Sequence, residues 1–201
     1  SIMCGIVASF DKETLKDLFA YNAYRGELSY SLASFNTNGE LQVIMKGPGK
    51  MPENFIDNYP TSGDYYIGHT QAPTTEAYNI HPASYKGSLL WHNGIIKQGM
   101  FQGPWDTEFI LKSIIEVGYR GLSTLNGTFA CIHYINNKLF VFRNEICPLF
   151  YDDNLNFSST KFPGSKPLRA NIVWEIDLLT KTLQSGTRFT TLENPYYFEE
   201  N

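Results

Sequence analysis

The sequence predicts an α+β fold, because many short β-type runs alternate with turn residues and only two segments show helical periodicity. The chain has 201 residues, of which 42% are hydrophobic and 15% aromatic, so it can bury one sizeable core. It is too short for two ordinary enzyme domains in tandem. We therefore expect residues 1–201 to form a single domain.

The β-type runs are joined by short turn sequences such as Asn38-Gly39 and Asn136-Asn137, which are typical of hairpin connections. Connections of this length predict antiparallel pairing. The expected strands are Cys4–Phe10, Tyr30–Phe35, Leu41–Met45, Tyr65–His69, Ser88–His92, Thr128–Tyr134, Lys138–Phe142, Leu149–Tyr151 and Asn171–Ile176.

Two segments repeat apolar residues at helical spacing. The first is Thr14–Tyr24, where Asp11 can cap the start of the helix. The second is Asp106–Val117, which begins with an aspartate and carries a wide apolar face. The stretch from Phe162 to Lys166, which contains proline and glycine, is expected to be a loop within the domain.

The charges and the apolar pattern argue against two classes of partner. The chain has 16 basic and 20 acidic residues, a net charge of -4, and they are scattered without runs. No cationic stripe is present for a phosphate backbone, so nucleic acid is not an expected partner. No apolar stretch approaches the roughly 18 residues of a membrane helix, and no secretory leader is visible. These patterns predict a soluble, cytoplasmic protein.

The cysteines and histidines do not predict a disulfide framework or a metal site. Cys4, Cys131 and Cys147 are widely spaced, which indicates reduced thiols. The four histidines lack the short spacing of metal-binding motifs, and no glycine-rich phosphate loop or dinucleotide fingerprint occurs. We therefore expect no metal and no cofactor.

The start of the chain, Met3-Cys4-Gly5-Ile6, contains a candidate nucleophile. If Met3 is the initiator and is removed, Cys4 carries a free α-amine beside its thiol. The amine titrates near roughly 7.7–8.0 and the thiol near roughly 8.5, so the neutral amine can accept the thiol proton. Ser1-Ile2 precedes Met3 and is an expression remnant, a short propeptide or a blocked terminus. The plainer alternative is that Cys4 opens a buried strand as a small apolar residue.

Further segments, each ambiguous alone, follow Cys4 in a recognisable order. Together with it they resemble the glutaminase domain of class II glutamine amidotransferases, the N-terminal nucleophile group that includes asparagine synthetase and glucosamine-6-phosphate synthase. The resemblance covers nearly the whole chain. The segments that carry it are Tyr24-Arg25-Gly26, Gly68-His69-Thr70-Gln71-Ala72-Pro73-Thr74, His92-Asn93-Gly94, Asp106-Thr107-Glu108, Phe142-Arg143-Asn144, Pro148-Leu149-Phe150-Tyr151 and Phe157-Ser158-Ser159.

The resemblance implies a four-layer αββα sandwich of two antiparallel sheets, with Cys4 at the start of a strand. It implies that Cys4 attacks the side-chain amide of glutamine to form a thioester, while Asn93 and Gly94 donate to the oxyanion. It places Asp106 against the substrate α-ammonium. Gln71, Arg25 and His92 are further candidates for binding the substrate. In the family the Arg25 loop mainly shapes the pocket through contacts to backbone, and the plainer alternative for His92 is a hydrogen bond within neighbouring strands. The released ammonia would serve a separate synthetase or transferase chain.

Gln71 departs from the family pattern, which has an arginine there to hold the substrate α-carboxylate. A neutral amide replaces a charged, bidentate donor, and losing one member of a buried charged pair lowers affinity by roughly 30-fold to several thousand-fold. Another cation such as Arg25 compensates, or the substrate is not free glutamine, or the domain is catalytically silent. The alternatives to a glutaminase are thus a silent binding or regulatory module and an N-terminal nucleophile hydrolase of another amide.

Overall fold

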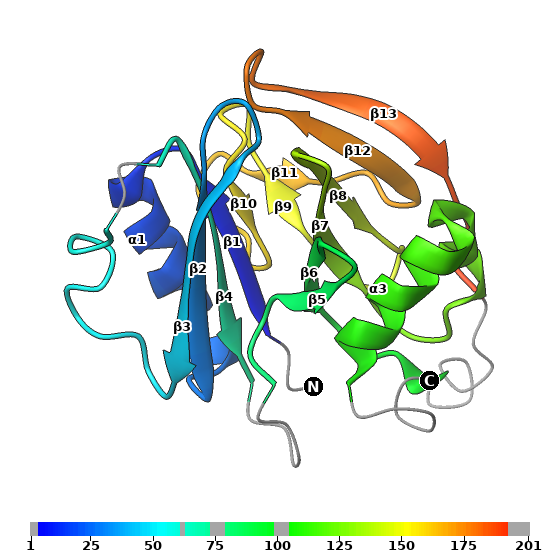
Figure 1. Cartoon of the computed structure of the whole chain (residues 1–201), viewed down its shortest axis with the longest axis horizontal. Helices are drawn as coiled ribbons and strands as arrows, with labels where there is room; N and C mark the ends of the chain where they lie inside the picture. The colour runs from blue at the N-terminus through cyan, green and yellow to red at the C-terminus, as the bar shows by residue number, and fades with distance from the viewer. Residues whose placement is uncertain (1–3, 61–62, 73–78, 99–104, 193–201) are drawn as a thin grey trace.

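The computed structural model describes residues 4–60, 63–72, 79–98 and 105–192. These residues form two antiparallel sheets that face each other, with one helix outside each sheet (Figure 1). The helices are α1 (Lys12–Asn22) and α3 (Asp106–Val117), followed by the short 3₁₀ turns η1 (Ala23–Arg25) and η2 (Tyr119–Thr124). The layer order is therefore α1, first sheet, second sheet, α3, which confirms the predicted αββα sandwich.

The two sheets are named here by their strands. Sheet A has the order β11-β9-β10-β1-β4-β2-β3, with bounds Lys166–Pro167, Phe150–Tyr151, Phe157–Ser158, Gly5–Ser9, Tyr65–Gln71, Ser29–Phe35 and Leu41–Pro48. Sheet B has the order β13-β12-β8-β7-β6-β5, with bounds Thr182–Arg188, Ile172–Asp177, Lys138–Arg143, Ala130–Ile135, Ser88–Asn93 and Ala83–Tyr85.

Alternation along the strands distributes side chains between the layers. In β1, Ile6 faces the core between the sheets, whereas Val7 faces α1. From sheet B, Trp91 and Ile132 enter the same central core, and all four side chains are fully buried. Burying a large apolar side chain contributes about 1.5–3 kcal/mol. This central core fixes the relative position of the sheets.

Each helix covers the outer face of one sheet. Residues of α1, including Leu15 and Leu18, pack on sheet A, and residues of α3, including Ile110 and Leu111, pack on sheet B. The predicted cap of α1 is present, since the backbone N–H of Thr14 donates to Asp11 Oδ2 at 2.9 Å. No helix within the described residues is long and apolar enough to cross a lipid bilayer.

Every strand expected from the sequence has a counterpart, with ends shifted by a few residues. The expected loop Phe162–Lys166 is one residue too long, because Lys166 pairs with Tyr151 in β11. The helix expected over Thr14–Tyr24 begins earlier, at Lys12, and its last turn tightens into η1. The strands β5, β10, β11 and β13 are additional to those expected.

The topology brings the motif residues to one end of the sandwich. Strands β1 and β4 are antiparallel neighbours, with Gly5 opposite Thr70, so the start of β1 lies beside the end of β4. Strand β6 ends at Asn93, opposite Ala130 at the start of β7. The two sheets are joined at this end by a hydrogen bond between His69 Nε2 and the carbonyl of His92, at 3.0 Å.

Candidate active site

Cys4 lies immediately before β1, and its thiol is partly buried. The backbone N–H of Ala72, which follows β4, donates to Cys4 Sγ at 3.3 Å. Burial raises the pKa of the thiol to about 11, and the carboxylate of Asp106 adds to the rise. The Ala72 N–H and the guanidinium of Arg25 oppose it. With its amine in a peptide bond, Cys4 is therefore a protonated, weakly nucleophilic thiol at neutral pH.

This raised pKa predicts the reactivity of the chain in which residues 1–3 precede Cys4. At pH 7 its thiolate fraction is about 100-fold below that of an ordinary thiol, because its pKa is about 11 where an ordinary cysteine has 9.0. The rate of alkylation by iodoacetamide is expected to rise about tenfold per pH unit from 7 to 10. Peptide mapping at each pH measures the alkylation rate of Cys4, with free cysteine as the reference. A rate that levels off near pH 8 would contradict the burial argument.

Arg25 holds the start of β1 through one side-chain hydroxyl and two backbone carbonyls. Its Nε donates to Thr160 Oγ1 at 2.7 Å, and its Nη2 donates to the carbonyl of Ser159 at 2.9 Å. Its Nη1 lies 3.5 Å from the carbonyl of Cys4. The next residue, Gly26, has φ +152° and packs so closely on the Gln71 carbonyl that a Cβ would approach it to 2.4 Å. The Arg25-Gly26 segment thus attaches the start of β1 to the neighbouring segments.

Gln71 is buried, and both ends of its amide have partners. Ser29 Oγ donates to Gln71 Oε1 at 2.5 Å, and Gln71 Nε2 donates to the carbonyl of Asn79 at 2.9 Å. Residues 73–78, which include the motif residues Pro73-Thr74, lie outside the described residues, as does Ser1-Ile2-Met3. The amide of Gln71 therefore ties β2 to the segment that precedes β5.

Asn93 ends β6, and its amide contacts a buried thiol. Asn93 Nδ2 lies 3.7 Å from Cys147 Sγ, and the Cys147 thiol donates to the Asn93 carbonyl at 3.3 Å. Asn93 Oδ1 is buried without a hydrogen-bond partner. A 180° rotation of the amide would place an N–H donor where this oxygen lies and Oδ1 beside Cys147 Sγ, and the S–H would then donate to Oδ1 in place of the Asn93 carbonyl. In that orientation the Asn93 side chain presents an N–H donor at the end of β6.

Gly94 follows with a backbone conformation that requires glycine. Its φ is +131°, and a Cβ would lie 2.1 Å from the carbonyl oxygen of Thr128. The close approach sets the direction of the chain after Asn93, and hence the direction of the Gly94 N–H.

Asp106 and His92 lie close together at the N-terminal end of α3. Asp106 Oδ2 accepts the backbone N–H of Ile96 at 3.1 Å, and Oδ1 is 4.0 Å from His92 Nδ1. Burial lowers the pKa of His92, and Asp106 opposes this without charging the ring at neutral pH. The Asp106 side chain is 20% exposed, so its carboxylate can still meet a cation from solvent.

Sequence reasoning missed several residues of this region. His81 and Thr107 form hydrogen bonds around His92, and Cys147 and Ser29 contact Asn93 and Gln71. Thr107 belongs to the Asp106-Thr107-Glu108 segment, but no motif signals its bonds to the two histidines, and His81, Cys147 and Ser29 lie outside the motifs, because these contacts arise from packing between segments that are distant in the sequence. Within the described residues, no group of three or more histidine, cysteine and acidic side chains could hold a metal ion.

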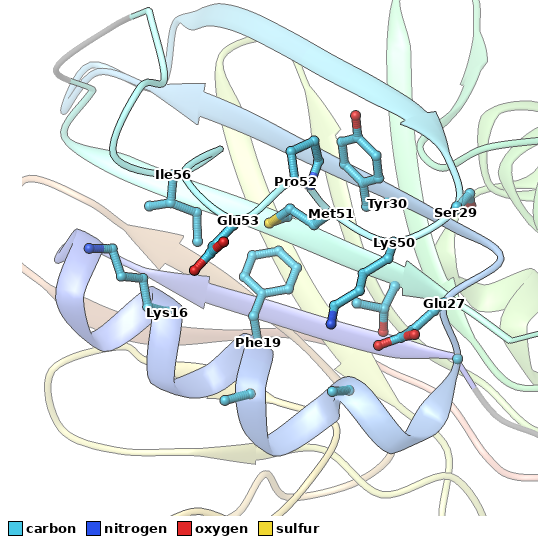
Figure 2. A pocket seen from close by; sticks show the side chains of 15 residues that line it. Lys16, Phe19, Glu27, Ser29, Tyr30, Lys50, Met51, Pro52, Glu53 and Ile56 are labelled. Atoms are coloured by element: carbon cyan, nitrogen blue, oxygen red, sulfur yellow. The ribbon is translucent and has the colours of Figure 1, made fainter.

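A cavity of about 480 Å³ lies on the other side of sheet A, between α1 and the segment 49–56 (Figure 2). Figure 2 shows an apolar centre formed by Phe19, Met51 and Ile56, with charged side chains around it. Its lining includes Ser29 and Thr70 but not Cys4, Asn93 or Asp106. This cavity is therefore separate from the Cys4 site.

The comparisons with known proteins point to amidotransferases. No protein-family model matches the chain. The isomerizing glutamine–fructose-6-phosphate aminotransferase of Clostridium acetobutylicum is 30% identical over an alignment of 141 positions, and the alignment covers 59% of this chain and 23% of that protein.

Two solved structures share the fold over 92% of this chain. One is glutamine phosphoribosylpyrophosphate amidotransferase from B. subtilis, with a TM-score of 0.67 and 17% identity, and this chain covers 49% of it. The other is an allosteric regulatory enzyme of purine biosynthesis, with a TM-score of 0.64 and 18% identity, and 48% of it is covered. This chain thus spans about half of each solved structure and about a quarter of the curated relative. The chain has the fold of a class II glutamine amidotransferase domain, as its motifs predict.

Proposed function

We propose that this chain hydrolyses the side-chain amide of glutamine through Cys4 and supplies ammonia to a separate synthetase or transferase chain. The observation that carries the proposal is the meeting of a thiol, a carboxylate and a guanidinium at one end of the sandwich. Asp106 and Arg25 both act electrostatically on the Cys4 thiol. The fold and the likeness to an aminotransferase that uses glutamine support the same assignment.

The chemistry requires a free α-amine on Cys4 in the active protein. Burial keeps the thiol protonated, so the attacking sulfur needs a base within reach. The amine accepts the thiol proton as the sulfur attacks the amide carbon of glutamine. The C–N bond then breaks, the proton passes to the leaving nitrogen, and ammonia departs. Water cleaves the thioester, which releases glutamate and restores the thiol.

The oxyanion of each tetrahedral intermediate would lie between two donors. One is Asn93 Nδ2, in the amide orientation that directs Oδ1 to Cys147, and the other is the N–H of Gly94. Each such donor lowers the barrier by about 2.7–4 kcal/mol. Asn93 is buried and its Oδ1 has no hydrogen-bond partner, so water does not compete for this end of the amide.

Asp106 would bind the α-ammonium of glutamine, while the α-carboxylate would lie toward Gln71. The Gln71→Arg variant is expected to lower KM for glutamine by at least about 30-fold, because it restores a charged donor. Kinetics of ammonia release measure this, and Gln71→Met, which offers no donor, is the matched control. Thermal melting of both variants separates binding from stability. An unchanged KM in a folded Gln71→Arg protein would show that another group holds the carboxylate.

A second candidate function, a catalytically silent binding or regulatory module, is favoured by one observation. Both polar atoms of the Gln71 amide are already bonded to Ser29 and Asn79. A silent module would release no ammonia from glutamine. An N-terminal nucleophile hydrolase of another amide would turn over that amide but not glutamine.

A diazo-ketone analogue of glutamine tests the nucleophile directly. The protein is first checked by intact mass, so that the sample has Cys4 as its first residue. One adduct at Cys4 is expected, glutamine should protect against it, and the buried thiols Cys131 and Cys147 should remain unmodified. The absence of an adduct on such a sample would overturn the proposed function.

A further inference from the structure

Three histidines that are distant in the sequence meet beside the proposed oxyanion hole. His69 lies in β4, His92 lies in β6, and His81 precedes β5. All three are buried, and the rings of His69 and His81 are stacked with 3.6 Å between their centroids. The hydroxyl of Thr107 lies 3.0 Å from His81 Nε2 and 3.1 Å from His92 Nδ1. One hydroxyl therefore joins two imidazoles.

The carbonyl of Thr128, at one end of this group, determines which atom donates in each of its hydrogen bonds. His92 Nε2 lies 3.3 Å from the carbonyl of Thr128, and a carbonyl only accepts, so Nε2 carries the proton. His92 is neutral, because burial lowers its pKa. Its Nδ1 is therefore unprotonated and accepts the proton of the Thr107 hydroxyl. The Thr107 oxygen has no second proton, so it accepts from His81 Nε2.

His81 Nδ1, the remaining ring nitrogen of His81 and His92, is consistent with this order of donors and acceptors. In a neutral His81 that donates through Nε2, the other nitrogen, Nδ1, is a bare acceptor. His81 Nδ1 is buried without a hydrogen-bond partner. The chain of bonds therefore runs from His81 through Thr107 and His92 to Thr128.

The hydrogen bond from Thr107 to His92 Nδ1 affects the charge that faces Asp106. The Asp106 carboxylate lies 4.0 Å from this nitrogen, so a protonated His92 would pair with it. An imidazolium there would compete with the ammonium of a substrate. The Thr107 proton fills the position that the extra proton would take.

We propose that Thr107 is a positioning residue that keeps His92 in its neutral Nε2–H form and so leaves the Asp106 carboxylate free for the substrate α-ammonium. The catalytic consequence rests on the proposed glutaminase function. The hydrogen-bond order itself does not, because it follows from the described contacts and from the burial of a neutral His92. Thr107 also connects the start of α3 with the residue that precedes Asn93.

The first test is spectroscopic and needs no activity. Long-range ¹H–¹⁵N correlation on ¹⁵N-histidine-labelled full-length protein at pH 7 is expected to give His69, His81 and His92 as neutral Nε2–H tautomers. Thr107→Val, which keeps the shape and removes the hydroxyl, is expected to shift His92 toward the charged form, and Thr107→Ser should restore the parent pattern. A charged or Nδ1–H form of His92 in the unaltered protein would overturn the proposal.

The second test is kinetic. In Thr107→Val, KM for glutamine is expected to rise about tenfold while kcat changes less than about threefold, because Asp106 binds substrate but does not react. The KM defect should be larger at pH 6 than at pH 8, because the competing His92–Asp106 pair forms at low pH and is lost as pH rises. The titratable groups that face His92 are Asp106 from α3, His69 from β4, His81 from the segment before β5, and the thiol of Cys131 from β7.

The two tests distinguish a failure of the proposed glutaminase function from a failure of the role proposed for Thr107. If the unaltered protein releases no ammonia, the proposed function fails, and the tautomer pattern still decides the role of Thr107. If the folded Thr107→Val protein keeps both the parent KM and the parent tautomers, the positioning role is wrong. If that variant unfolds, the tautomers of the unaltered protein and of Thr107→Ser decide.

Discussion

Replacing Cys4 by alanine is expected to reduce the rate of ammonia release from glutamine by at least about 10⁴-fold, to the rate measured in buffer without protein. The variant lacks the sulfur that forms the thioester, and alanine cannot replace it. The Cys4 side chain is only partly buried and accepts one backbone N–H, so its loss should change stability little. The measurement is coupled detection of ammonia with matched protein concentrations.

Cys131→Ala is the matched control for this prediction. It removes a thiol from the core of sheet B, where the side chain is fully buried among apolar residues. Its activity should stay near that of the parent, while its melting temperature falls. Equal ammonia release from the parent protein and from folded Cys4→Ala would favour the silent module.

Replacing Gly94 by alanine is expected to destabilise the fold by about 2–4 kcal/mol, or roughly 10 °C in Tm. The new methyl group would lie 2.1 Å from the carbonyl oxygen of Thr128, and the φ of +131° is strained for alanine. The backbone must move, and the N–H of Gly94 moves with it. In the fraction that stays folded, turnover should fall by about 10²- to 10³-fold.

Gly87→Ala separates the steric clash from the backbone strain. Gly87 also has a positive φ, +75°, but a Cβ there meets nothing within 4 Å. It should lose about 1 kcal/mol from strain alone and keep full activity. Thermal melting and ammonia release of the two variants measure the difference. Equal effects in both would mean that the contact with Thr128 is not what requires glycine at position 94.

The sequence predicts the fold well wherever alternation places apolar side chains in the central core. Strand β1 has buried residues throughout and is easily identified. Strand β13, Thr182–Arg188, is an edge strand with mostly exposed polar side chains, so its sequence carries no apolar alternation. The strands β10 and β11 are only two residues long, and their pairing partners are set by tertiary packing.

The candidate site is predicted less completely than the fold. The order of the motifs identifies Cys4, Asn93 and Asp106, and the topology explains why the starts and ends of their elements share one end of the sandwich. Cys147, which contacts Asn93, has no local signal, and Thr107 lies in a motif that does not reveal its bonds to His81 and His92. Their contacts depend on how two sheets and a helix meet, which local periodicity does not encode.

The interior position of β1 in sheet A has a consequence for maturation. The strand is anchored on both sides, by β4 along Gly5–Ser9 and by β10 at Val7 and Ala8, and the Ile6 backbone bonds to Ser159 through both its N–H and its carbonyl. Every one of these attachments begins after Cys4, so trimming the polypeptide back to Cys4 removes none of them. The free amine on Cys4 that the proposed function requires can therefore be produced after folding, with the pairing of β1 intact.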